Sequence, residues 1–239
     1  VMLGAVSQSG NTPTMYNPII CFDASDTSAS NITESVNLVS LIKDRSGNGI
    51  DGVQATGSAQ PTTNLHTING LNTVYMDVGD YLQMLAVATA ANLTIICVFK
   101  PLGNNNATGA FFSADAADND FQIDSGAIGQ YLGRVLTSNL GSTTAPTIVT
   151  NEMGSAILTT YRFSDTDGDV KVRLNGVQKS SDTYNGLMNS SLAMRIGINR
   201  ALNVSLKLDL AELLIFNQDL SATQIDTIET YLINKWGIV

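Results

Sequence analysis

Two tight-turn signals divide residues 157–179 into three strand-like runs, and this pattern constrains the fold more than any other part of the sequence. Asp167-Gly168 separates the first run from the second, and Asn175-Gly176 separates the second from the third. These dipeptides favour hairpin turns because Asn, Asp and Gly tolerate positive φ. Val170-Lys171-Val172-Arg173-Leu174 alternates apolar and basic residues, which is typical of a strand with one buried face. We therefore predict consecutive antiparallel hairpins.

Short runs of β-branched and aromatic residues recur along the rest of the chain. Residues 93–100 form the clearest run, which Pro101 is expected to close. Residues 36–43 fit a strand or a helix, residues 23–34 are typical of a loop, and residues 138–156 show no clear pattern. Further strands are expected at 19–22, 74–76, 81–84, 110–113, 121–123, 131–137, 193–198 and 209–216. Many short strands with almost no helix predict an all-β fold, a sandwich or jelly roll of two antiparallel sheets.

One α-helix is predicted at the C-terminus. Ser221 is expected as its N-cap, with Gln224 completing a capping box, and Gly237 as its left-handed C-cap. Lys235 suits the negative C-terminal end of the helix. One face is apolar, and we expect it to pack on a sheet with Trp236, the only tryptophan, as its main contact: Ile225, Ile228, Leu232 and Trp236. The polar residues expected away from that face are Asp226, Glu229 and Asn234.

The net charge and the short apolar stretches exclude two classes of partner, nucleic acid and membrane. Twelve Lys and Arg against 21 Asp and Glu give a net charge of −9, and the basic residues occur singly. No basic run could follow a phosphate backbone, so nucleic acid is excluded as a partner. An anionic membrane would repel the chain, and no apolar stretch is long enough for membrane insertion.

Cys21 and Cys97 lie in apolar runs and are expected as buried free thiols rather than a disulfide.

Residues 1–18 differ in character from the rest of the chain. They are polar, carry Gly, Ser and Thr, and end at Pro18. We interpret them as an N-terminal arm or linker. Residues 19–239 then form one domain, because β-sandwiches of 200–250 residues commonly form single domains.

The sequence lacks the residue sets of common hydrolases. Glycosidases place two carboxylates on either side of the scissile bond, but Glu212 has no acid at the following strand positions and is expected to be structural. His66 is the only histidine and is expected at the surface in a polar loop. There is no Gly-x-Ser-x-Gly nucleophile motif. We therefore expect a protein that is not an enzyme, with no required cofactor.

Several segments in chain order carry a family resemblance: 22–26 (Phe-Asp-Ala-Ser-Asp), 43–49 (Lys-Asp-Arg-Ser-Gly-Asn-Gly), 76–82 (Met-Asp-Val-Gly-Asp-Tyr-Leu), 174–176 (Leu-Asn-Gly), 211–217 (Ala-Glu-Leu-Leu-Ile-Phe-Asn) and 235–237 (Lys-Trp-Gly). Together they resemble the laminin-G-like branch of the concanavalin A-like lectin/glucanase superfamily. The resemblance covers about residues 19–239. It implies a jelly roll of two antiparallel sheets, of the kind found in phage virion proteins and secreted bacterial proteins.

The resemblance also implies a calcium site. In the family, the Asp and Asn of the turn at 43–49 often join an acid near the last strand, and Asp44 and Asn48 match the turn. Ala211 stands at the position of that acid. Asp209 is two residues earlier, on the same side of a strand, and would have to replace it. Calcium suits these residues because it prefers oxygen ligands, although the ligand set is incomplete.

These observations favour a domain that acts by surface contact. Our main hypothesis is a virion-surface structural protein of a phage, which decorates a capsid or forms part of a tail or fibre. Its partners would be neighbouring virion proteins or copies of itself, held through the arm, with a cell-surface glycan as a further ligand. The alternative is a carbohydrate-binding or adhesion module of a secreted bacterial protein, which would be extracellular. A third hypothesis is a degenerate glycoside hydrolase or lyase.

Overall fold

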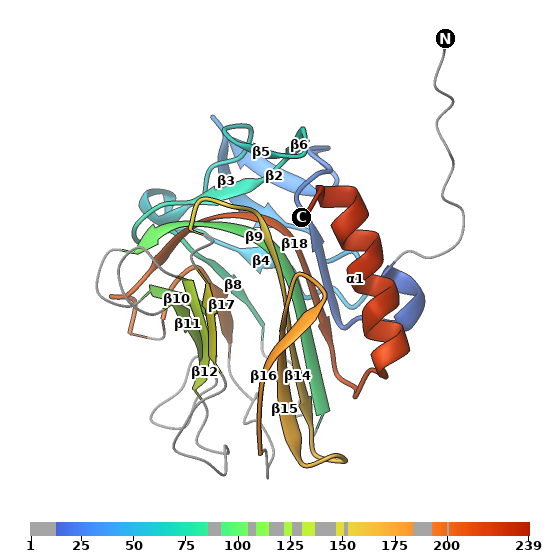
Figure 1. Ribbon diagram of the computed structural model, residues 1–239. Coiled ribbons are helices and arrows are strands. Elements are labelled where there is room, and N and C mark those ends of the chain that lie inside the picture. Colours follow the sequence, from blue (N-terminus) through green and yellow to red (C-terminus); the bar gives the residue numbers. More distant parts are fainter. Residues whose placement is uncertain are drawn as a thin grey trace.

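The computed structural model in Figure 1 describes residues 13–85, 92–104, 109–114, 122–125, 131–136, 147–150, 153–183, 193–199 and 201–239. These residues form two antiparallel sheets that pack face to face, with one α-helix on the outside. The fold class expected from the sequence, an all-β jelly roll with a C-terminal helix, is confirmed.

The first sheet carries the helix. Among the described residues it has seven strands in the order β1-β18-β9-β14-β15-β16, and β7 also pairs with β18. Every pair is antiparallel. The strands are β1 (Ile20–Asp23), β7 (Val74–Met76), β9 (Asn92–Asn104), β14 (Ile157–Ser164), β15 (Asp169–Leu174), β16 (Val177–Thr183) and β18 (Leu206–Phe216).

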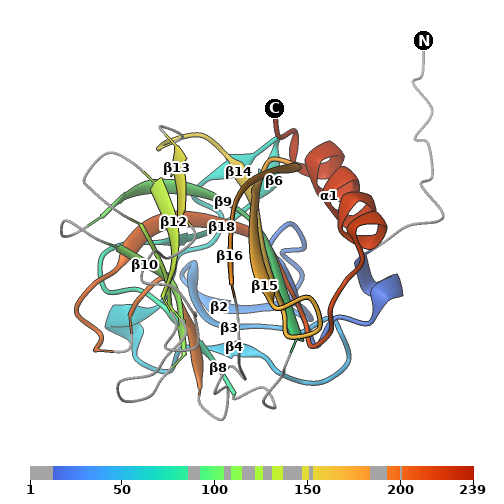
Figure 2. The ribbon, with the colours of Figure 1, turned by 60° about the horizontal axis from the view of Figure 1, so that its bottom comes forward.

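The second sheet lies opposite the first (Figures 1 and 2). Within the described residues it has nine strands in the order β13-β12-β11-β10-β17-β8-β4-β3-β2. They are β2 (Ile32–Ser35), β3 (Leu38–Ile42), β4 (Gly52–Val53), β8 (Leu82–Met84), β10 (Gly109–Ala114), β11 (Gln122–Ser125), β12 (Tyr131–Leu136), β13 (Thr147–Thr150) and β17 (Met194–Ile196). A separate hairpin joins β5 (Thr67–Ile68) to β6 (Leu71–Asn72), and two short 3-10 helices cover Pro13–Tyr16 and Gly57–Ala59.

Strand β9 is buried on both faces. Ile95, Cys97 and Phe99 belong to the core between the two sheets, whereas Ile96 and Val98 belong to a second cluster beneath the helix. A strand covered on both sides gains from apolar residues at every position. This double burial explains why the run at 93–99 is almost continuously apolar.

The helix α1 (Ala222–Trp236) lies along the outer face of the first sheet (Figures 1 and 2). The predicted capping box of Ser221 and Gln224 is present, and Gly237 adopts the left-handed conformation with φ of 62°. The predicted apolar face is buried on the sheet, with Trp236 only 1% exposed. Glu229 was expected away from this face, and that expectation is wrong, because Glu229 is 2% exposed and binds side chains of the sheet.

The predicted hairpins at 157–179 are confirmed. β14 pairs with β15, and β15 pairs with β16. Gly168, Asn175 and Gly176 all have positive φ, as their turns require. The alternation in β15 is also as predicted, since Val170 and Val172 are buried between half-buried neighbours.

Other strand boundaries differ from expectation. β9 continues through Pro101 to Asn104 instead of ending there. Its pairing with β14 ends at Phe99, so the missing N–H of Pro101 breaks no hydrogen bond on that side, and the register with β18 shifts nearby. β2 begins inside the expected loop at 23–34, and β13 lies in the unassigned segment 138–156. The ambiguous run at 36–43 is a strand, β3.

Both cysteines are free and buried, as predicted: Cys21 and Cys97. Burial raises the pKa of Cys21 to about 12.

The expected arm at 1–18 is described only from residue 13 onward, and residues 1–12 lie outside the described residues. Its last residues contact the domain, because the carbonyl of Tyr16 accepts a hydrogen bond of 2.7 Å from Gln218. No helix in the described part of the chain is long and apolar enough to cross a membrane.

Candidate functional site

The turn at 43–49 holds the start of β1 through the carboxylate of Asp44. One oxygen accepts hydrogen bonds from the backbone N–H groups of Cys21, at 3.0 Å, and Ser46, at 2.9 Å. The other oxygen accepts hydrogen bonds from the Ser46 hydroxyl, at 2.7 Å, and the Ile50 N–H, at 3.1 Å. Both oxygens of this buried carboxylate therefore bind donors of the protein itself.

Asn48 also helps to hold the turn against the chain that enters β1. Its side-chain amide donates to the carbonyls of Pro18, at 3.3 Å, and Ile19, at 3.2 Å, and to the Ser46 hydroxyl at 2.9 Å. The structure thus brings Asp44 and Asn48 together, with Ser46 between them. Their contacts in the structure fix the turn against the chain as it enters β1.

Asp209 has a different partner. It is 1% exposed in β18, and its Oδ1 lies 2.7 Å from Nδ1 of His66. Burial raises the pKa of Asp209, although the hydrogen bond from His66 opposes this effect. His66 is partly exposed, as expected for a loop. Neither its pairing with Asp209 nor its edge-to-face contact with Tyr75, at 4.9 Å between ring centroids, has a local signal in the sequence.

Strand geometry separates Asp209 from the turn that holds Asp44. Asp44 binds the backbone of Cys21, and Cys21 lies opposite Leu214 of β18. Leu214 follows Asp209 by five residues, which corresponds to about 15 Å along a strand. One ion cannot bind Asp44 and Asp209 across this distance. Among the described residues, no group of three His, Cys, Asp or Glu side chains is placed to hold a metal ion.

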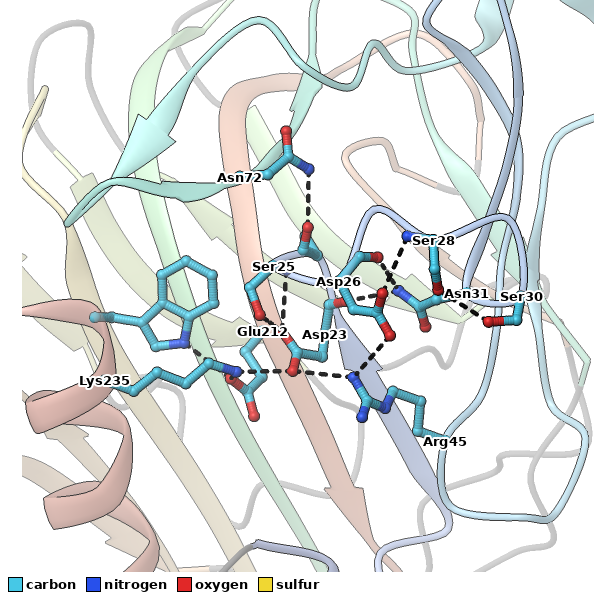
Figure 3. A network of polar contacts seen from close by, with 12 residues as sticks. Asp23, Ser25, Asp26, Ser28, Ser30, Asn31, Arg45, Asn72, Glu212 and Lys235 are labelled. Atoms are coloured by element: carbon cyan, nitrogen blue, oxygen red, sulfur yellow. Dashed lines mark hydrogen bonds and ion pairs between the residues drawn. The ribbon is translucent and has the colours of Figure 1, made fainter. Parts of the chain in front are cut away.

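A partly buried polar network joins the last turn of α1 to the first sheet (Figure 3). The ammonium of Lys235 lies between two carboxylates, 2.6 Å from Glu212 and 2.8 Å from Asp23. The indole N–H of Trp236 donates to the same oxygen of Glu212 at 2.8 Å. Burial disfavours the charge of Lys235, but Glu212 and Asp23 outweigh it and raise the pKa of the ammonium. Arg45 extends the network by binding Asp23 at 3.2 Å.

Glu212 therefore makes the structural contacts expected of it. Its side chain is 3% exposed and is held by groups of the helix. The sequence did not reveal these partners, because Glu212 and Lys235 are 23 residues apart and belong to different elements.

A second set of ion pairs lies near the first turns of α1. The carboxylate of Glu229 accepts hydrogen bonds from the Thr160 hydroxyl, at 2.7 Å, and from the guanidinium of Arg173, at 2.7 Å. Arg173 also binds Asp226 at 2.6 Å. On the neighbouring strand, Arg162 binds three aspartates: Asp167, Asp169 and Asp219. These pairs hold both guanidinium groups on the outer face of the sheet.

A hollow of about 350 Å³ opens between these ion pairs and the helix. We call it the helix-start groove. It is lined by strand residues and by the first turn of α1: Arg162, Asp167, Lys171, Arg173, Gln178, Ser221, Ala222 and Ile225. Two other hollows are a polar one of about 240 Å³ beside Trp236 and one of about 310 Å³ beside β4 and β8.

Comparison with known proteins supports the fold. No family model and no curated protein sequence matches the chain. Domain 4 of AbnA, a GH43 extracellular arabinanase from Geobacillus stearothermophilus, solved in complex with arabinotriose, has a TM-score of 0.59 and 15% identity. That match covers 89% of this chain and 98% of the arabinanase domain.

Binding domains of botulinum neurotoxin serotype D have a similar fold. One has a TM-score of 0.62 and 13% identity, and another, in complex with N-acetylneuraminic acid, has a TM-score of 0.64 and 14% identity. Each match covers 93% of this chain and 53% of the neurotoxin domain. This chain thus spans about half the length of those domains. At these identities the likeness shows the fold, a β-sandwich of the jelly-roll type.

Proposed function

We propose that this chain is a non-catalytic jelly-roll domain that acts by surface contact and binds a glycan. One observation carries the proposal: 89% of this chain matches the fold of an arabinanase domain, over 98% of that domain, and the domain's structure was solved with arabinotriose. The match to a neurotoxin binding domain in complex with N-acetylneuraminic acid adds support from a second protein with a sugar ligand.

The contacts of the two buried glutamates, Glu212 and Glu229, favour binding over catalysis. A glycosidase needs one carboxylic acid that can donate a proton and a second carboxylate that can reach the sugar. Glu212 is held by Lys235 and Trp236, and Glu229 is held by Thr160 and Arg173. Both are almost fully buried, so neither is free to act on a substrate.

Two finer parts of the proposal are supported by the sequence alone. The ordered motifs support a place in the laminin-G-like branch. The high content of Asn, Ser and Thr and the arm at 1–18 support a role at a phage virion surface. The arm would lock into a neighbouring subunit or a second copy. A module of a secreted bacterial protein is the alternative. Calcium binding would draw on Asp44 and Asn48, without Asp209, and would have to displace hydrogen bonds that the Asp44 carboxylate accepts from Cys21, Ser46 and Ile50.

A glycan array probed with the full chain tests the proposed function. We expect saturable binding to a defined group of glycans. The array is run once with calcium and once with a chelator. Loss of glycan binding in the chelator would show that binding requires a metal ion. No binding in either condition would contradict the proposal and leave protein–protein assembly as the better explanation.

A further inference from the structure

We infer that the helix-start groove is the glycan-binding site and that its ligand is a neutral oligosaccharide. This inference rests on the proposed function. The groove is lined by residues of β14, β15 and β16 and by the first turn of α1. Its volume of about 350 Å³ is at the small end of the range of about 300–1,000 Å³ usual for small-ligand sites. A short stretch of sugar residues fits such a hollow better than a long polymer buried along its length.

The polar lining is held in place by the protein itself. Arg162 is 11% exposed and binds three aspartates, and Arg173 is 18% exposed and binds Asp226 and Glu229. The guanidinium groups are therefore fixed before any ligand arrives. A site with fixed polar groups loses less conformational entropy on binding.

The charges of the groove decide the class of ligand. Three cationic side chains line it, but their ion-pair partners are five carboxylates: Asp167, Asp169, Asp219, Asp226 and Glu229. The groove with its partners therefore carries an excess of negative charge, on a chain whose net charge is −9. A phosphate, sulfate or uronic acid would find no net attraction there.

A neutral sugar matches this lining. Each hydroxyl can accept from Lys171 or from the Gln178 amide and donate to an oxygen of Asp167. The C–H groups of the sugar ring can lie on the exposed methyl group of Ala222, which the first turn of α1 adds to the groove above the buried Ile225. Alternating donors and acceptors beside a small apolar surface favour a polyhydroxylated ligand over an ion.

Two variants remove contacts without disturbing the core. Lys171→Ala and Gln178→Ala change side chains at the surface of β15 and β16. The matched control is Lys207→Ala: Lys207 also pairs with an aspartate at 2.7 Å, as Lys171 does, but lies outside the groove. A third variant, Ala222→Phe, blocks the groove from the exposed start of the helix, with Thr223→Phe as its control one residue on.

The test is a titration of each variant with the strongest neutral glycan of the array, after urea unfolding has shown that each is folded. We expect Lys171→Ala and Gln178→Ala each to weaken binding about tenfold, the usual effect of one lost hydrogen bond of this kind. Ala222→Phe should abolish binding, and both controls should bind as the wild type does.

The possible failures can be told apart. If the wild type binds a neutral glycan and all the groove variants bind equally well, this inference is overturned while the proposed function stands. If the wild type binds only acidic glycans, or if its affinity falls steeply as salt is raised, the ligand class is wrong. If the wild type binds no glycan, the proposed function fails and the inference fails with it.

Discussion

Replacing Glu212 with alanine tests how the helix is held on the sheet. The Glu212 carboxylate accepts hydrogen bonds from Lys235, at 2.6 Å, and from the buried indole N–H of Trp236, at 2.8 Å. After the substitution the indole N–H has lost its acceptor, while Lys235 keeps Asp23 at 2.8 Å. We therefore expect the last turn of α1 to be weakened rather than released.

The size of the effect follows from these contacts. Leaving the buried N–H of Trp236 without a partner costs about 1–3 kcal/mol, and a hydrogen bond to a charged group contributes about 1.5–3 kcal/mol. The free energy of unfolding should fall by about 3–5 kcal/mol, as it does when one partner of a buried ion pair is removed. For a chain of this length the melting temperature should fall by roughly 10 °C. Glu212→Gln keeps the volume and one acceptor, and should cost about half as much.

Urea unfolding followed by tryptophan fluorescence measures this directly, because Trp236 is the only tryptophan and lies in the network. Asp226→Ala is the control, since Asp226 lies on the same helix with a side chain 61% exposed, and should cost less than about 1 kcal/mol. A Glu212→Ala midpoint equal to that of the wild type would refute the account of how the helix is fixed.

Three further predictions follow from single features. Val36 is 90% exposed with a φ of 54°, so Val36→Asn should raise the free energy of unfolding by about 1 kcal/mol in urea, because a left-handed conformation strains a β-branched residue; no gain would mean that the turn is unstrained. Burial raises the pKa of Asp209, so its contribution to stability is complete below its unfolded pKa of about 3.9 and is lost as pH rises through the raised value; relative to Asp209→Asn, the wild type should therefore be most stable near pH 4 and lose that advantage toward pH 7, and the opposite trend in urea midpoints would contradict this. Cys21 and Cys97 are buried, so a thiol reagent should label neither in the native protein and both in denaturant, and rapid native labelling would show that the sheet opens.

Local signals in the sequence were sufficient to predict much of the fold. The turns at Gly168 and Gly176 and the caps at Ser221 and Gly237 depend on residues a few positions apart, and each forms as expected. β2 has no such signal, because only Ile32 of its four residues is buried and the strand exists through its pairing with β3.

The polar contacts of the candidate site were beyond local reasoning. Helical spacing predicts an exposed position for Glu229, yet the residue is buried and pairs with Arg173, 56 residues away. His66 and Asp209 are separated by 143 residues. The helix-start groove likewise exists only where the start of α1 meets strands β14–β16, so no segment of sequence contains its pattern.

A calorimetric titration of the full chain with a neutral glycan chosen from the array, followed by mass spectrometry of the recovered glycan, shows whether the domain binds sugars without cleaving them. We expect saturable binding and a glycan recovered at its original mass. Heat without saturation, or a shortened glycan, would contradict the claim that this domain binds sugars without cleaving them.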